Sequence, residues 1–149
     1  MAAATRILLI DDEEIVRDSC TEILRDEPYE VATAADGAAG LERMRDFRPD
    51  LVVVDLKMPG LSGLEVLERI READPTLVPI VITGYATVSS AVDAMKRGAY
   101  DFLPKPFTPE EFRLIVRRGA EKRALVLETQ ALRRERELLR EHFAAIVAK

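Results

Sequence analysis

The sequence predicts an α/β fold in which a parallel sheet carries helices on both faces. Two observations predict it: apolar runs of strand length alternate with segments of helical period, and the alternation continues to about residue 120. Runs that are apolar throughout are typical of strands covered on both faces, which βαβ units with right-handed crossovers provide. The strand candidates are Ile7–Ile10, Tyr29–Ala34, Leu51–Val54, Val78–Ile82 and Asp101–Leu103, of which the second and the fifth are the weaker.

Helix-period segments separate these strands. They span Glu14–Arg25, Gly37–Asp46, Gly63–Glu72 and Val88–Arg97. The residues expected to face the sheet are Ile15, Val16, Ile23, Leu24, Leu41, Met44, Leu64, Leu67, Ile70, Val92 and Met95. Asp36, Ser62 and Thr87 are of the types that cap helix starts, and Gly98 can end a helix.

Composition restricts the class of protein. The chain has 149 residues, 48% of them hydrophobic, and no apolar stretch near the ~20 residues that span a bilayer. The opening "MAAATR" lacks the apolar region of a signal peptide, and the single Cys20 cannot form an intrachain disulfide, so we expect a cytoplasmic protein without membrane contact. Residues 1–108 carry 12 basic and 20 acidic side chains, whereas residues 109–149 carry 10 and 7. The acidic part is therefore not expected to bind nucleic acid by itself.

Polar residues stand where the predicted strands end. Asp11 and Asp12 follow the first strand, Asp55 ends the third, Thr83 ends the fourth and Lys105 follows the fifth. Considered singly, each residue has a simpler explanation. A pair of acids after a strand more often begins a helix, a threonine there is more often part of a turn, and a lysine is more often a solvated cation. Ligands of parallel sheets gather beyond the carboxyl ends of the strands, so the joint placement favours one shared site.

The residue types indicate what this site does. Carboxylates crowded together repel by about 4 kcal/mol per pair at ~4 Å and an effective dielectric of ~20, so positive charge must compensate them. Lys105 supplies one charge, and hard oxygen ligands without histidine or cysteine favour Mg²⁺, or Mn²⁺, over zinc. Carboxylate, metal, hydroxyl and ammonium form a phosphoryl-transfer set, in which Asp55 attacks in line and becomes an aspartyl phosphate.

Four segments, "ILLIDDEE", "DLVVVDLKMPGLSGLEVL", "PIVITGYA" and "GAYDFLPKPF", resemble the receiver domain of two-component response regulators over about residues 5–120. The resemblance implies a flavodoxin-like, doubly wound sheet of five parallel strands in the order 2-1-3-4-5. It also implies a signalling domain that assists its own phosphorylation and dephosphorylation, rather than an enzyme.

By this resemblance, Asp55 accepts phosphate from a histidine kinase. Asp12 and Asp55 bind Mg²⁺ directly, the backbone carbonyl of Lys57 completes the protein ligands, and Asp11 acts through water. The resemblance further implies that Thr83 bonds the phosphoryl group, that Lys105 pairs with it, and that the Lys105–Pro106 bond is cis. Phe102 stands where the family often has tyrosine, which leaves switching by ring burial and excludes a hydroxyl hydrogen bond.

Several residues near these motifs have simpler explanations. Glu13 and Glu14 are predicted to begin a helix, and the Lys57 side chain to be solvated. Met58 and Cys20 are predicted to pack, and His142 is given no catalytic role because no ligand partner is spaced to join it.

Three alternative functions remain to be weighed against this one. A phosphatase of the haloacid-dehalogenase class needs a second aspartate two residues on, but Leu56 and Lys57 follow Asp55. A flavodoxin needs a phosphate loop after the first strand, where "DDEE" would repel phosphate. A module that only docks a partner would not need the intact set of acids.

From Pro109 the pattern predicts helix almost to Lys149, so we expect a receiver over 1–120 and a helical extension over 121–149. Leu125, Leu132, Leu139 and Ile146 recur every seven residues, flanked by Ala124, Ala131, Leu138 and Ala145, as in a coiled-coil seam. The seam is imperfect, because either companion set is polar, with Thr129 and Arg136 in one and Glu128, Glu135 and His142 in the other. A helix packed on its own receiver, or a charged linker, is the alternative.

We predict a homodimer, formed through this helix, through the face of the fourth helix, fifth strand and fifth helix, or through both. The arginines between 133 and 140 alternate with glutamates, which favours a solvated face over DNA binding. The extension resembles the helix that leads into either the ATPase domain of a nitrogen-regulator-type activator or the dimerisation helix of a histidine kinase. No output domain is recognisable in the chain, and the residues leave open whether it stands alone or belongs to a longer protein.

Overall fold

The computed structural model describes residues 4–148. The first three residues of the predicted receiver and Lys149 at the end of the predicted extension lie outside the described residues. Five parallel strands form one sheet in the order β2-β1-β3-β4-β5, as predicted. The strands are β1 (Thr5–Ile10), β2 (Tyr29–Ala34), β3 (Leu51–Asp55), β4 (Val78–Thr83) and β5 (Asp101–Pro104). The helices are α1 (Glu14–Ile23), α2 (Gly37–Phe47), α3 (Gly63–Ala73), α4 (Val88–Lys96) and α5 (Pro109–Val147).

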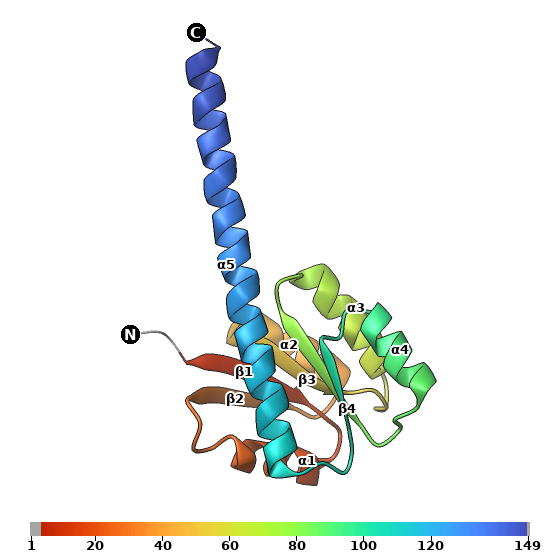
Figure 1. Cartoon of the computed structure of the whole chain (residues 1–149). Helices are drawn as coiled ribbons and strands as arrows, with labels where there is room; N and C mark the ends of the chain where they lie inside the picture. Colours follow the sequence, from red (N-terminus) through yellow and green to blue (C-terminus); the bar gives the residue numbers. More distant parts are fainter. Residues whose placement is uncertain (1–3, 149) are drawn as a thin grey trace.

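Helices cover both faces of the sheet, and each face has its own apolar core (Figure 1). Alternate residues of a strand point to opposite faces, so in β3 Val52 and Val54 join the core beneath α2 and α3, while Leu51 and Val53 join the core beneath α1 and α5. This is why the strand sequences are apolar throughout. Helix α5 lies so close to the sheet at Gly119 that a Cβ there would stand 2.6 Å from Leu51 Cδ2.

The predicted starts of the first four helices and the capping residues are confirmed, and the predicted ends differ from the observed ones by one or two residues. The side chains of Asp36, Ser62 and Thr87 accept hydrogen bonds from backbone N–H groups of α2, α3 and α4. Gly98 follows α4 with a φ of +103°, a conformation that glycine adopts at helix ends without steric cost. Thr108 caps α5 through a capping box with Glu111.

Three residues predicted to face the sheet do not. Ile15 is 79% exposed, and Val92 and Met95 are 45% and 48% exposed, so these predictions were wrong. Helix α1 buries the stripe that contains Cys20 and ends near Leu24, and Ile15 lies outside it. In α4 the residue that meets the core is the small Ala94, which leaves the larger side chains of the helix toward solvent. The other eight residues predicted to face the sheet do pack on the core, so apolar period gave the buried face of α2, α3 and most of α1 but not that of α4.

Only the first third of α5 packs on the sheet, where Phe112, Ile115, Val116 and Gly119 are buried. The remainder projects away from the body (Figure 1). The seam leucines Leu125, Leu132 and Leu139 are 59%, 58% and 64% exposed. A helix packed along its own receiver is therefore excluded for residues 131–148, which are exposed throughout, whereas the coiled coil stays a prediction. Among residues 4–148, no helix has the length and apolar character needed to cross a bilayer.

Candidate functional site

Four acidic side chains meet at the carboxyl ends of β1 and β3. One carboxylate oxygen from each of Asp11, Asp12, Glu13 and Asp55 lies within 4.8 Å of the others. Asp11 and Asp55 are buried, with 2% and 3% of their surface exposed, whereas Asp12 and Glu13 are open to solvent. The structure thus brings together the three aspartates that the strand ends predicted and adds a glutamate.

Lys105 holds this cluster together from the end of β5. Its Nζ donates hydrogen bonds to Asp11 Oδ2 and Glu13 Oε1 at 2.9 Å, and to Asp55 Oδ2 at 3.0 Å. The Lys105 backbone N–H donates to the carbonyl oxygen of Thr83 at 2.8 Å, which fixes the loop that carries the ammonium. The Lys105–Pro106 peptide bond is cis. One ammonium therefore faces three carboxylates, and the negative charge is in excess.

The pKa values record this imbalance. Burial raises the pKa of Asp11 above its ordinary value, and the nearby charge of Asp55 raises it further, although the hydrogen bond from Lys105 opposes both. Burial alone would lower the pKa of Lys105, but hydrogen bonds to Asp11, Glu13 and Asp55 raise it above the ordinary lysine value. Lys105 is therefore a permanent cation at neutral pH.

The rim of the site comes from the loops after β3 and β4. The Lys57 backbone N–H donates to Asp55 Oδ1 at 3.3 Å, and the Lys57 ammonium lies 4.1 Å from the centre of the Tyr85 ring. These residues line a cavity of about 510 Å³ that opens onto Asp12 and Asp55. Solvent and small solutes can therefore reach Asp55 from this side.

Thr83 and Phe102 lie outside this cavity. Thr83 is fully buried at the end of β4, and its hydroxyl accepts a hydrogen bond from the Tyr85 backbone N–H at 3.2 Å. Phe102 is half-buried in β5 and packs on the core beneath α2 and α3. Neither side chain has a hydrogen bond or ion pair to the acidic cluster among the described residues.

Sequence reasoning missed two features of the site. Glu13 was expected to serve only the start of α1, yet it makes no side-chain cap and its carboxylate bonds Lys105 instead. The Lys57 side chain is exposed, as expected, but its ammonium also lies over the Tyr85 ring. The spacing of Glu13 two residues after Asp11 was a usable signal, whereas the Lys57–Tyr85 contact joins two loops and has no local signal. The predictions that Met58 and Cys20 pack are confirmed, because both are buried.

The cluster has the donor set of a hard divalent cation. It offers carboxylate oxygens only, without histidine or cysteine, and oxygens within 4.8 Å of one another can converge on one ion. Mg²⁺–oxygen bonds of about 2.1 Å place opposite ligands about 4.2 Å apart, so small movements or a bridging water would complete the fit. Such an ion would also balance the excess negative charge that Lys105 leaves.

Comparison with known proteins identifies the family. The model of the response regulator receiver domain matches residues 7–117 of this chain. The chain belongs to the receiver domain family. The fold and the acidic cluster at the carboxyl end of the sheet agree with this membership.

Its relatives include transcriptional regulators that are much longer. The chain is 44% identical to the C4-dicarboxylate transport transcriptional regulatory protein DctD of Pseudomonas aeruginosa over 88% of its own length and 28% of that protein. It is 39% identical to the nitrogen assimilation regulatory protein NtrX of Azorhizobium caulinodans, over 87% of its length and 27% of that protein. The chain thus spans under a third of these relatives.

Solved structures agree with the fold. NtrX from Brucella abortus, in complex with ADP, superposes with a TM-score of 0.82 at 38% identity, over 87% of this chain and 30% of that one. The beryllofluoride-activated NtrC4 receiver domain dimer superposes with a TM-score of 0.75 at 37% identity, over 79% of this chain and 98% of that one.

Proposed function

We propose that this receiver is a phosphorylation switch in which Asp55 accepts a phosphoryl group from a histidine kinase with the help of Mg²⁺. The observation that carries the proposal is the position of Asp55. It is buried within a ring of carboxylates, bonded to Lys105 at 3.0 Å, and still reached through the cavity beside Lys57. A carboxylate that only stabilised the fold would need neither the surplus of acids nor the opening.

In this proposal an Asp55 carboxylate oxygen attacks the phosphorus of a phosphohistidine. A P–O bond forms, the P–N bond breaks, and the imidazole leaves with its electron pair. Lys105, already bonded to Asp55, holds the attacking carboxylate and then pairs with the transferred phosphoryl oxygens. Bound Mg²⁺, or Mn²⁺, would neutralise phosphoryl charge.

The proposed metal ligands are Asp12, Asp55 and the Lys57 backbone carbonyl, with Asp11 acting through water. Asp11 has both carboxylate oxygens engaged, with the Glu13 N–H at 2.9 Å and Lys105 Nζ at 2.9 Å, which supports an indirect role. Asp12 is the exposed member of the pair and is free to turn toward the ion. Thr83 and Phe102 complete the proposed switch, with the threonine hydroxyl turning from Tyr85 toward the phosphoryl group.

A groove beside the site supports a docking position for the donor protein. It has a volume of about 910 Å³, runs between α1 and the loop before α5, and is lined by Ile15, Phe107 and Lys105 among others. Ile15 is 79% exposed at this groove, so its apolar side chain is available to a docked partner. We therefore expect Ile15→Ala to slow transfer from a phosphorylated kinase while transfer from acetyl phosphate is unchanged.

We further propose that phosphorylation changes self-association. The solved relative NtrC4 is a receiver dimer in its beryllofluoride-activated form, and beryllofluoride mimics a phosphoryl group. In this chain Val88, Val92 and Met95 leave α4 with an exposed apolar face, and Leu125, Leu132 and Leu139 continue along α5. These surfaces support a homodimer through the α4–β5–α5 face, the extension, or both.

The test is intact-mass spectrometry after incubation with Mg²⁺ and acetyl phosphate. We expect a gain of about 80 Da, one phosphoryl group, which Asp55→Asn abolishes and EDTA suppresses. Asp36→Asn, which alters an exposed helix cap outside the cluster, is the matched control and should retain the gain. A gain that persists in Asp55→Asn would refute the assignment of the phosphoacceptor.

Light-scattering mass on the same samples tests the association. A monomer that becomes a dimer only with the mass gain would support switching through assembly. A dimer present before phosphorylation would mean that phosphorylation alters the surface of an existing dimer. Dissociation of that dimer in Leu132→Asp would then show that the extension holds it together.

A further inference from the structure

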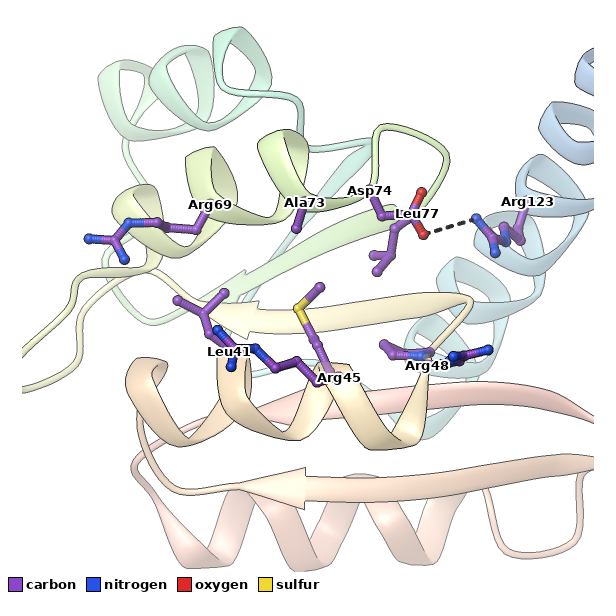
Figure 2. Close-up of a pocket in the computed structure, with 10 residues that line it drawn as sticks. Leu41, Arg45, Arg48, Arg69, Ala73, Asp74, Leu77 and Arg123 are labelled. Atoms are coloured by element: carbon purple, nitrogen blue, oxygen red, sulfur yellow. Dashed lines mark ion pairs between the residues drawn. The ribbon is translucent and has the colours of Figure 1, made fainter.

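A second cavity lies at the other end of the sheet from Asp55. It has a volume of about 570 Å³ and opens between α2 and α3, next to the residues that precede β3 and β4 (Figure 2). Its floor is apolar and includes Leu41, Met44 and Leu77. Its charged lining consists of Arg45, Arg48, Arg69 and Arg123, with Asp74 as the one acidic residue. This is the size of cavity that holds one small organic molecule.

Three of these arginines are unpaired. Within residues 4–148, Arg45, Arg48 and Arg69 have no ion pair, and all three are exposed. Arg123 is 15% exposed and is already engaged by Asp50 and Asp74. Residues 1–108 carry 20 acidic side chains against 12 basic ones, so acidic partners are abundant, yet three cations line one cavity without any.

The arginines sit at both ends of the cavity. Figure 2 shows Arg69 and Leu41 toward one end, and Arg48 and Arg123 toward the other, with Ala73 between them. Arg48 takes its place with a φ of 51°, a left-handed conformation that a bulky side chain adopts only at some cost in energy. The positive charge thus lies at the rim of a concave apolar surface, where it attracts an anion to the cavity.

We propose that this cavity binds a small organic anion, in which a phosphate or carboxylate group is joined to an apolar or planar body. Guanidinium groups bind both anions with paired hydrogen bonds, and they also stack on planar rings. The apolar floor, with the adaptable side chain of Met44, would contact the body of the ligand. The site is separate from the one at Asp55, because it shares no lining residue with the cavity at the carboxyl end.

The cavity also contacts the helix that leaves the domain. Arg123 Nη1 lies 3.8 Å from Asp74 Oδ2, and Arg123 Nε donates to Asp50 Oδ1 at 3.3 Å. An anion at this end competes with Asp74 for the same guanidinium. We therefore expect anion binding to change the surroundings of the Arg123 guanidinium as well as those of the lining residues on α2 and α3.

The test is an NMR titration of the ¹⁵N-labelled full chain without Mg²⁺, so that phosphate is not drawn to Asp55. The probes are AMP, inorganic phosphate and phthalate. We expect saturable shifts of the Ala73 and Leu77 amides and of the Arg123 Nε signal, with AMP binding more tightly than inorganic phosphate because of the apolar floor. Saturable shifts with phthalate would show that a carboxylate serves as the anionic group, whereas shifts with the two phosphate probes alone would assign that group to phosphate.

Arg45→Gln and Arg69→Gln should each weaken binding about tenfold, the effect of losing one charge-assisted hydrogen bond. Arg43→Gln is the matched control: Arg43 lies on the same helix α2, is exposed, and does not line the cavity. The proposal is overturned by the absence of saturable shifts up to about 10 mM of every probe, a concentration that detects even weak sites. An equal loss in Arg43→Gln also overturns it, because binding would then be diffuse surface attraction.

Discussion

The two ends of the sheet carry the same kinds of charged group in different proportions. At the carboxyl end, the single ammonium of Lys105 faces several carboxylates, including the buried Asp11 and Asp55. At the amino end, the guanidinium of Arg123 pairs mainly with Asp50. The neighbouring cavity is lined by four arginines and one aspartate, so positive charge is in excess there. One end has too much negative charge for its own partners and the other too much positive charge.

The difference distinguishes a structural ion pair from a functional cluster. The Asp50 carboxylate is fully used within the fold, because it accepts from the Arg6 backbone N–H at 2.8 Å and from Arg123 Nε at 3.3 Å. It thereby ties β1, the start of β3 and α5 together. The carboxyl end keeps charge that the protein does not balance, and a site of this kind is ready for an external cation.

The largest expected effect is on the structural pair. Asp50→Ala removes the acceptor of the Arg6 N–H and leaves the largely buried Arg123 with a weaker partner, so we expect a loss of about 2–3 kcal/mol in the free energy of unfolding. Urea denaturation measures it. Asp46→Ala, an exposed residue on α2 without a hydrogen bond among the described residues, should change stability by less than about 0.5 kcal/mol. Equal losses in the two variants would show that Asp50 is not a structural tie.

A smaller effect of opposite sign is expected at the carboxyl end. Asp11→Asn removes one of the crowded charges and keeps an acceptor, so in metal-free buffer at neutral pH it should raise the free energy of unfolding by about 0.5–1 kcal/mol. With Mg²⁺ the wild type should become the more stable of the two proteins, since the ion binds the complete acidic cluster more tightly and stabilises the folded state by that binding.

The pH dependence gives the same variant a second readout. The folded pKa of Asp11 is raised from 3.8, so the folded state holds its proton longer than the unfolded chain. The contribution of Asp11 to the free energy of unfolding is therefore most favourable at low pH, where the carboxyl is protonated. It is lost as the pH rises from 3.8, the ordinary value, through the higher pKa of the folded state. Asp11→Asn should lack this part of the pH profile in urea titrations without metal. A profile identical to that of the wild type would contradict the account of crowding.

The smallest expected effect on stability concerns Cys20, in the core beneath α1. Cys20 is 1% exposed, and burial, reinforced by the charge of Asp11, raises its pKa to about 12. Its thiol should react with a disulfide reagent at pH 8 at least about a thousandfold more slowly in the native chain than in urea. Because the unfolded thiol ionises near 9.0, stability should also fall slightly as pH rises above that value. Rapid native labelling would show that the core beneath α1 opens readily.

The sequence alone determined the order of the elements and the carboxyl-end cluster. Apolar runs and turn residues gave all five strands and the helix starts, because both signals are local to the chain. The position of Asp11, Asp12 and Asp55 at strand ends was enough to predict that they meet, because parallel strands bring their carboxyl ends to one edge.

Only the tertiary structure decided the buried face of α4, the exposure of Ile15 on α1 and the gathering of arginines from distant segments around one cavity. Ile15, Val92 and Met95 have the periodicity of core residues but are exposed, since the packing angle of a helix on the sheet selects its buried stripe. The arginine-lined cavity joins residues from α2, α3 and α5, and no local pattern marks it. The contact between Lys105 and Glu13, which the sequence did not predict, spans 92 residues of sequence. Period and composition act over one or two turns of chain, whereas these features depend on how distant segments close on one another.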